Sequence, residues 1–230
     1  MSLIVLDTML HFSLHVCIIH TMYKEVQAHW FHVQGYCDCQ LYLKVRGGID
    51  AEHTKELMDG IHAHADLDKE LNVNDVHVSQ LEDRVYQAQA KNQPFTVREA
   101  AVSGARIYGR IDCLEYHLNK VVISDNKPKP STGEPFPGDK RQLFAYCMAF
   151  SAQFPNTTSP IIAVFRDHDD KEYWSHEFVE SDKADVINTV DRILDILNEV
   201  RQPFPAKEFK CRTCHYLSMC RWSPLKAFRR

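Results

Sequence analysis

Asp112, Asp125 and Lys127 have residue types and a spacing that suit metal-assisted hydrolysis of a phosphodiester. Each acid follows β-branched residues in a strand-like run, 107–114 for Asp112 and 121–127 for Asp125. Two carboxylates that meet at one end of a sheet suit Mg²⁺ or Mn²⁺, which keep positions open for water and a phosphate oxygen. Because side chains alternate along a strand, Lys127 should share a face with Asp125 and could orient the attacking water. Asp-x-Lys alone is also a common surface pair, so the interpretation depends on its surroundings.

A second pair, Gln142 and Tyr146, lies in the helix expected over residues 139–153. Four residues apart, the two side chains share a helix face, so an amide and a phenol could hold a nucleic-acid strand against the metal. The alternative is an ordinary amphipathic helix with three apolar residues facing the core: Leu143, Cys147 and Phe150. Both interpretations can hold, because the two sets occupy partly different faces.

The cysteines give an independent signal of metal binding. Eight are present, no secretory signal is evident, and the chain is too large for a small disulfide scaffold, so we expect an intracellular, cytoplasmic metalloprotein. Cys211, Cys214 and Cys220 form a compact triplet that needs a fourth thiolate, which Cys37 can supply, with Cys39 as the alternative. A cluster joining residue 37 to residues 211–220 would link the two ends of the domain. The other three cysteines are expected to be buried small residues: Cys17, Cys113 and Cys147.

The order Gly-x-Ile-Asp112, Asp125-x-Lys127, Gln142-x-x-x-Tyr146 resembles RecB-type nucleases of the PD-(D/E)XK superfamily. The resemblance covers roughly residues 24–230. It implies an upstream histidine ligand within Gly-x-x-x-His, a position that His64 matches, with His62 as its rival. It implies one or two divalent ions held by four residues: His64, Asp112, Asp125 and, through its carbonyl, Asn126.

Three clustered cysteines and a distant one resemble the 4Fe-4S nucleases: the CRISPR-associated exonuclease of the Cas-four type, the bacterial AddB nuclease domain and eukaryotic exonuclease V. In the CRISPR group the first ligand lies in Tyr-Cys-Pro-Arg-x-Leu-Tyr, which aligns with Cys37, although Asp38-Cys39 replaces Pro-Arg here. The resemblance implies exonuclease action on single-stranded DNA from a 5′ end, with the CRISPR integrase as partner in spacer acquisition. Three alternatives stay open: zinc at the thiolates, an exonuclease V-like repair or replication nuclease, and a non-catalytic DNA-binding scaffold. The sequence predicts no oligomeric state.

Composition fits one domain of this kind. The chain has 230 residues, 44% of them hydrophobic and 25% charged, which is enough for one substantial core. The net charge of −4 does not mark a nucleic-acid binder, but seven Lys/Arg residues and one acid lie between residues 207 and 230. Four aromatic residues are interleaved with them: Phe209, Tyr216, Trp222 and Phe228. The tail could therefore bind phosphates and stack bases, or it could simply solubilise the cysteine segment.

The expected elements are those of a restriction-endonuclease-like α/β core, a mixed sheet flanked by helices. Helices are expected over 51–70, 139–153 and 184–200, and strands within 97–127, at 161–165 and at 173–179, while residues 74–90 are ambiguous between strand and helix. Residues 1–23 read as an extension, with Met22 a candidate start. Their apolar run is too short and too mixed for a membrane span.

Overall fold

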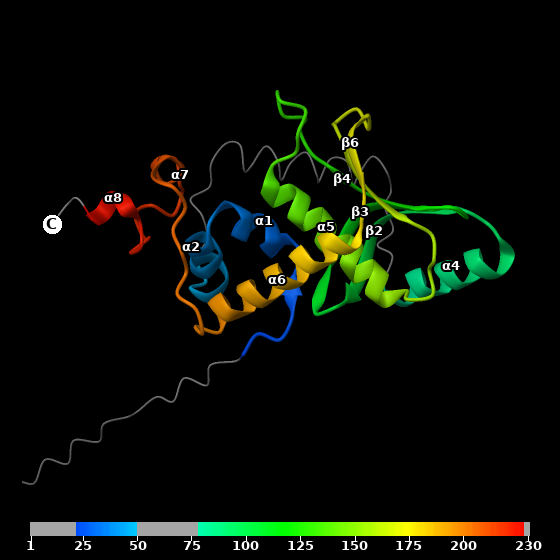
Figure 1. Ribbon diagram of the computed structural model, residues 1–230, viewed down its shortest axis with the longest axis horizontal. Helices are drawn as coiled ribbons and strands as arrows, with labels where there is room; N and C mark the ends of the chain where they lie inside the picture. The colour runs from blue at the N-terminus through cyan, green and yellow to red at the C-terminus, as the bar shows by residue number, and fades with distance from the viewer. Residues whose placement is uncertain (1–21, 50–77, 228–230) are drawn as a thin grey trace, which may run out of the picture.

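The computed structural model describes residues 22–49 and 78–227 of the chain (Figure 1). The expectations for the 51–70 helix and for the N-terminal extension fall outside these residues. Six strands are present in the described residues: β1 (Val26–Gln27), β2 (Phe95–Gly104), β3 (Ile107–Tyr116), β4 (Val121–Asn126), β5 (Ile161–Arg166) and β6 (Glu172–Glu177). The described helices are α1 (His29–Tyr36), α2 (Asp38–Leu41), the π-helix η1 (Tyr42–Arg46), α4 (Val78–Lys91), α5 (Pro137–Gln153), α6 (Glu180–Leu197), α7 (Glu208–Arg212) and α8 (Pro224–Ala227).

The strands form one mixed sheet, which confirms the expected α/β class. β2, β3 and β4 pair antiparallel in succession, β4 and β5 pair parallel, and β5 and β6 pair antiparallel. The short β1 runs parallel to the start of β3. The expected strands within 97–127 and near 161–165 and 173–179 are therefore present, with small shifts at their ends. The ambiguous stretch 74–90 is helical where it is described, as α4.

One edge of β3 is shared by two different strands. β2 pairs along the whole of β3, so β1 and β4 must both lie on its other edge. β1 covers Ile107 and Tyr108 there, and β4 covers residues 113–116. Residues 109–112 of β3 therefore face a gap in the strand pairing, where β1 and β4 part.

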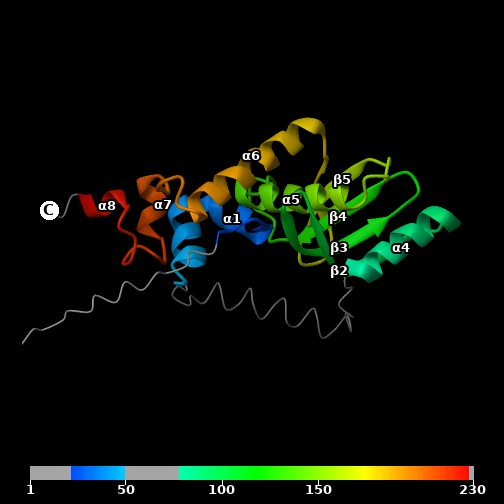
Figure 2. The ribbon, with the colours of Figure 1, turned by 90° about the horizontal axis from the view of Figure 1, so that it is seen from below.

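Helices stack on one face of this sheet in two layers. Figure 2 shows α5 over the sheet and α6 beyond it, with α4 and the C-terminal α7–α8 segment at opposite ends of the molecule. The amphipathic pattern predicted for α6 is confirmed, because its apolar residues are buried in the main core: Val186, Val190, Ile193, Leu194 and Leu197. In the first turn of α6, the Asp182 carboxylate accepts a 2.9 Å hydrogen bond from the backbone N–H of Val179, the residue before the helix, which satisfies a free N–H at the helix start.

Two glycines let α1 approach the first turn of α5. A Cβ at Gly35 would lie 2.6 Å from the Gly138 Cα, and one at Gly138 would lie 2.9 Å from the His32 carbonyl oxygen. Real Cβ atoms do not come so close to backbone, so only glycine allows this contact. The contact places the side chains of α1 beside the start of α5.

None of the helices in residues 22–49 and 78–227 combines the length and the apolar character needed to cross a membrane.

Candidate active site

Asp112, the first predicted carboxylate, lies on β3 at the gap between β1 and β4. Asp112 is the last of the β3 residues that face it, and its Oδ2 accepts a 3.1 Å hydrogen bond from the backbone N–H of Asn126 at the end of β4. This bond ties the strand that carries one acid to the end of the strand that carries the other. The two strand-like runs in the sequence thus bring Asp112 and Asp125 together.

Asp125 is 1% exposed and has Lys127 as its cationic partner. The Lys127 ammonium donates a 3.0 Å hydrogen bond to Oδ1, whereas Oδ2 is buried with no hydrogen-bond partner. Burial, and then the negative charge of Asp112, raise the pKa of Asp125 well above its usual range. Burial opposes the charge on Lys127, but the Asp125 and Asp112 carboxylates outweigh it and raise the pKa of the ammonium.

This donor set fits a divalent cation. A buried carboxylate oxygen without a partner requires an explanation, and a cation beside Asp125 and Asp112 would both satisfy that oxygen and lower the repulsion between the two acids. The remaining predicted ligand, His64, and its rival His62 lie outside the described residues. Within 22–49 and 78–227, no three His, Cys, Asp or Glu side chains lie close enough to hold an ion on their own.

Gln142 and Tyr146 of α5 lie beside the acids, but not as a surface for a strand. The Gln142 Nε2 donates a 3.0 Å hydrogen bond to the Tyr146 hydroxyl, and both side chains are buried. A Cβ at Gly109 of β3 would lie 2.8 Å from the Tyr146 ring, so the ring packs directly on the strand that carries Asp112. Burial, with Asp125 nearby, raises the pKa of Tyr146. We expected this pair to be open to a nucleic-acid strand. In the structure the helix face that carries Gln142 and Tyr146 is buried, as is the apolar face of α5.

Several polar residues near Lys127 were not singled out from the sequence. Asp139, in the first turn of α5, raises the pKa of Lys127, and its Oδ1 lies 2.7 Å from the His32 Nδ1 of α1. The His29 ring stacks near His32 with centroids 6.1 Å apart. On β6, burial raises the pKa of Tyr173 to about 12, with Asp139 and Asp125 contributing. No local motif marks these residues, because they meet Lys127 only through the packing of α1, α5 and β6.

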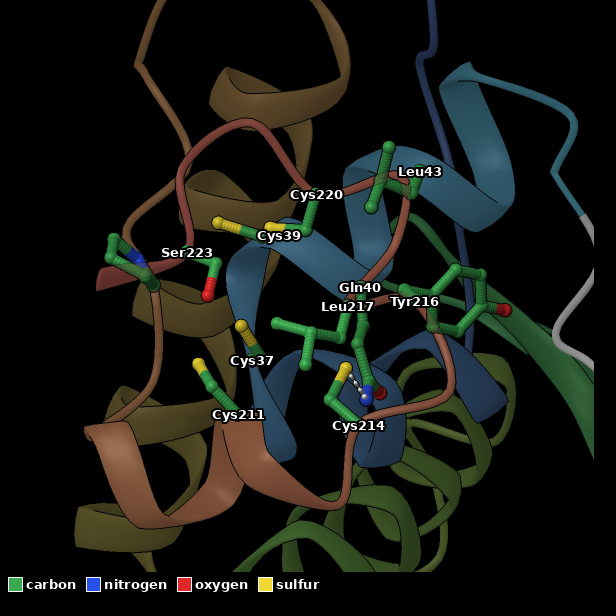
Figure 3. A pocket seen from close by; sticks show the side chains of 11 residues that line it. Cys37, Cys39, Gln40, Leu43, Cys211, Cys214, Tyr216, Leu217, Cys220 and Ser223 are labelled. Carbon is green, nitrogen blue, oxygen red and sulfur yellow. Dashed lines mark hydrogen bonds between the residues drawn. The ribbon is translucent and has the colours of Figure 1, made fainter. Parts of the chain in front are cut away.

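The cysteines gather at the other end of α1. Figure 3 shows that Cys37, Cys39, Cys211, Cys214 and Cys220 line one pocket, with the Cys37 and Cys211 sulfurs pointing toward each other and Cys39 beside Cys220. All five are free thiols. Cys113 and Cys147, which were expected to be buried small residues, are buried away from this pocket.

Polar groups around the pocket favour the thiolate of Cys37, whereas the hydrogen bond with Cys37 raises the pKa of Cys39 and burial raises that of Cys211. The Cys37 Sγ accepts a 3.3 Å hydrogen bond from the Ala206 amide, and the Cys214 Sγ accepts one of 3.3 Å from the Gln40 side chain. A hydrogen bond from Cys39 is the main reason that the pKa of Cys37 falls to about 6. Thiolates are the ligands that iron–sulfur clusters and zinc prefer, so this donor set fits either metal group.

Asp38 explains how the two ends of the chain meet here. Its carboxylate is 3% exposed and accepts hydrogen bonds from the Arg192 guanidinium of α6 (2.6 Å), the Gln34 amide (2.9 Å) and the Phe204 backbone N–H (3.2 Å). The last of these bonds holds the segment before α7 against α2.

Tyr216 of the basic, aromatic tail is buried among the cysteines rather than exposed for base stacking, whereas Phe209 is exposed.

Comparison with known proteins agrees with the fold. The family model of the PD-(D/E)XK nuclease superfamily matches residues 32–221, so the chain belongs to this superfamily. No curated protein matches the chain. A candidate exonuclease from Eubacterium rectale has a similar solved structure, with 15% identity, a TM-score of 0.51, and coverage of 86% of this chain and 89% of that one. Its similarity supports the fold.

Two further solved structures are less similar. The structure of SSO0001 has 17% identity and a TM-score of 0.44, and covers 88% of this chain and 89% of its own. The alkaline exonuclease LHK-Exo of Laribacter hongkongensis has 14% identity and a TM-score of 0.40, with coverage of 77% and 90%.

Proposed function

We propose that this protein is a divalent-metal-dependent exonuclease that hydrolyses single-stranded DNA. The observation that carries the proposal is the unpartnered, buried Oδ2 of Asp125, beside Asp112 and Lys127, in a chain of the PD-(D/E)XK nuclease superfamily. Mg²⁺ or Mn²⁺ bound there would act as a Lewis acid and lower the pKa of its water. A carboxylate pair with a lysine is the donor set that this chemistry requires.

The residues of the site have distinct parts in this proposal. Asp112, Asp125, the Asn126 carbonyl and His64 are the metal ligands. Lys127, held by Asp125, orients the attacking water or offsets the charge that develops on the phosphate. Gln142 and Tyr146 act from within the core: their hydrogen bond fixes the Tyr146 ring against β3 and so positions Asp112.

We further propose that the cysteine pocket binds a structural 4Fe-4S cluster through Cys37, Cys211, Cys214 and Cys220, with Cys39 as the alternative to Cys37 and zinc as the alternative metal. The convergence of these thiols from both ends of residues 24–230 supports a single nuclease domain that the cluster holds together. The RecB-like motifs extend the proposal to cleavage from a 5′ end. They also suggest a role in CRISPR spacer acquisition beside the integrase, or in exonuclease V-like repair or replication.

Cleavage of 5′- and 3′-labelled single-stranded DNA by anaerobically prepared protein tests the nuclease proposal. We expect cleavage that requires Mg²⁺ or Mn²⁺ and that Asp112→Ala and Lys127→Ala abolish, because one variant removes a ligand and the other the charge beside the scissile phosphate. The label that is released first gives the polarity.

Both variants should still bind DNA in EDTA and keep the visible absorption of the cluster, since neither residue contacts the cysteine pocket. Lys120→Ala, at the far end of the β3–β4 hairpin, is the control and should cleave normally. Binding without cleavage by the wild-type protein, under every metal tried, would instead favour the DNA-binding scaffold.

A further inference from the structure

A basic cluster near Lys127 has no role in the function proposed above. It consists of His29 and His32 on α1 and Lys44 on the π-helix η1. The Lys44 Nζ lies 3.0 Å from the His29 Nε2, and the His29 and His32 rings stack at an interplanar angle of 21°. An ammonium can only donate, so the His29 Nε2 is the acceptor in this contact.

The His29 imidazole of the α1–η1 basic cluster lies among positive charges. Burial first, and then the positive charges of Lys44, His32 and Lys127, lower the pKa of His29 to about 4. The His29 ring lies against His32, which contacts Asp139 in the first turn of α5, and Asp139 in turn acts on Lys127. Among the described residues no carboxylate forms an ion pair with Lys44, and its ammonium is exposed.

The cluster is built rather than accidental. The His32 Nδ1 is held by Asp139 at 2.7 Å, and the close approach of Gly138 to the His32 backbone fixes the two helices at this point. Lys44 is carried by a π-helix, a rare geometry that is common at functional sites. Two helices therefore bring a lysine and two histidines together, and His32 joins them to the first turn of α5.

We propose that Lys44 and His29 form a phosphate-binding subsite for the DNA strand, beside the metal site. The ligand is either a phosphomonoester at a strand end or a backbone phosphodiester next to the scissile bond. The phosphate oxygens replace the neutral imidazole as acceptor for Lys44, and His29 takes up a proton and donates to the same group. This subsite deepens the proposed nuclease function and rests on it, because it gives the strand a fixed register relative to Lys127.

Fluorescence anisotropy in EDTA, where no metal-dependent cleavage can occur, tests the subsite. We expect Lys44→Ala to weaken binding of a single strand roughly tenfold, the size of one lost charge-assisted hydrogen bond. The slope of log affinity against log salt should fall by about 0.7, as for one phosphate contact on a single strand. Lys44→Arg should retain most of the affinity, and Lys120→Ala is the surface-lysine control.

Strands with a 5′-phosphate, a 3′-phosphate or no terminal phosphate distinguish the two sources. A loss confined to one phosphorylated end identifies a terminal phosphomonoester, and an equal loss on all three identifies a backbone phosphodiester. If Lys44→Ala equals Lys120→Ala on every strand while the wild-type protein cleaves, the subsite is wrong and the nuclease proposal stands.

A second measurement does not depend on cleavage. The pH titration of the His29 ring signals by NMR, assigned with His29→Gln, should show its pKa raised when a deoxynucleoside 5′- or 3′-monophosphate is added. An unchanged titration at saturating nucleotide would overturn the subsite. A raised pKa in a protein that neither binds nor cleaves DNA would keep the phosphate subsite and remove the nuclease.

Discussion

The proposed activity depends on Asp125, whose environment opposes the charged form of its carboxylate. Its carboxylate is buried, one oxygen has no partner, and Asp112 adds a second negative charge nearby. Such an arrangement is unfavourable for the metal-free protein and favourable once a cation is present. Sites of this kind sacrifice some stability for function.

Removing the charge should therefore stabilise the metal-free protein. The pKa of Asp125 is raised in the folded state. As the pH rises, the unfolded chain therefore releases this proton before the folded protein does. The free energy of unfolding falls once the pH exceeds the ordinary pKa of an aspartate. Asp125→Asn cannot ionise, and the Asp112 carboxylate still acts on Lys127, so the variant should be more stable by about 1 kcal/mol at about pH 7 in EDTA. The advantage should vanish near pH 3, where both states are protonated.

Urea unfolding at the two pH values measures this difference. Asp83→Asn, on the exposed face of α4, is the control and should change little. Adding Mn²⁺ should raise the melting temperature of the wild-type protein but not that of Asp125→Asn. A wild-type protein that is the more stable of the two in EDTA at neutral pH would contradict this account.

At the scale of elements, the junction of α1 with α5 joins the proposed active site to the basic cluster. Gly35 and Gly138 allow backbone contact there, and the same turn presents Asp139 to His32 and Lys127. The predicted helix 139–153 begins two residues earlier in the structure, at Pro137, so its first turn includes Gly138. A small change in the distance between the two helices should therefore affect several site residues together.

Gly138→Ala tests this junction. In a helix without neighbours the change would stabilise slightly, because alanine has the higher helix propensity. Here the new methyl would lie 2.9 Å from the His32 carbonyl, so we expect a loss of about 1–3 kcal/mol of unfolding free energy in urea. Ser131→Ala, in the exposed loop before α5, should be neutral. A Gly138→Ala protein as stable as the wild type would show that the helices do not need this contact.

At the scale of the whole molecule, the cysteine pocket joins residues that are far apart in the chain. Cys37 and Cys39 come from the start of the described chain, and three cysteines come from its end. Asp38 supports the same junction through Arg192 and the Phe204 amide. A metal cluster there would close a loop that includes nearly the whole domain.

Single cysteine variants should show which thiols hold the metal. We expect Cys211→Ala, Cys214→Ala and Cys220→Ala to lose the visible absorption of the cluster and to melt at lower temperature, because the ends of the domain are then joined only by protein contacts. Whichever of Cys37→Ala and Cys39→Ala loses the absorption identifies the fourth ligand. Cys113→Ala, a buried thiol outside the pocket, should keep it. Full absorption in Cys211→Ala would rule out the cluster as proposed, and zinc without iron in metal analysis would identify the alternative.

The sequence by itself determined the parts of this protein that follow local rules. Alternation along strands placed Asp112, Asp125 and Lys127, because a strand fixes the face of every side chain by its period of two. Helical periodicity likewise identified the buried face of α6. The cysteine spacing predicted that Cys211, Cys214 and Cys220 lie together, and they line one pocket, while the metal that they would bind stays a prediction.

Only the tertiary structure decided what depends on contacts between distant elements. Gln142 and Tyr146 share a helix face as predicted, but whether that face meets solvent or β3 is decided by how α5 packs. His29 and Lys44 look like ordinary surface residues in the sequence. They become a basic cluster because Lys44 of η1 contacts His29 of α1, while His32 of α1 contacts the first turn of α5, and no local period encodes such a meeting.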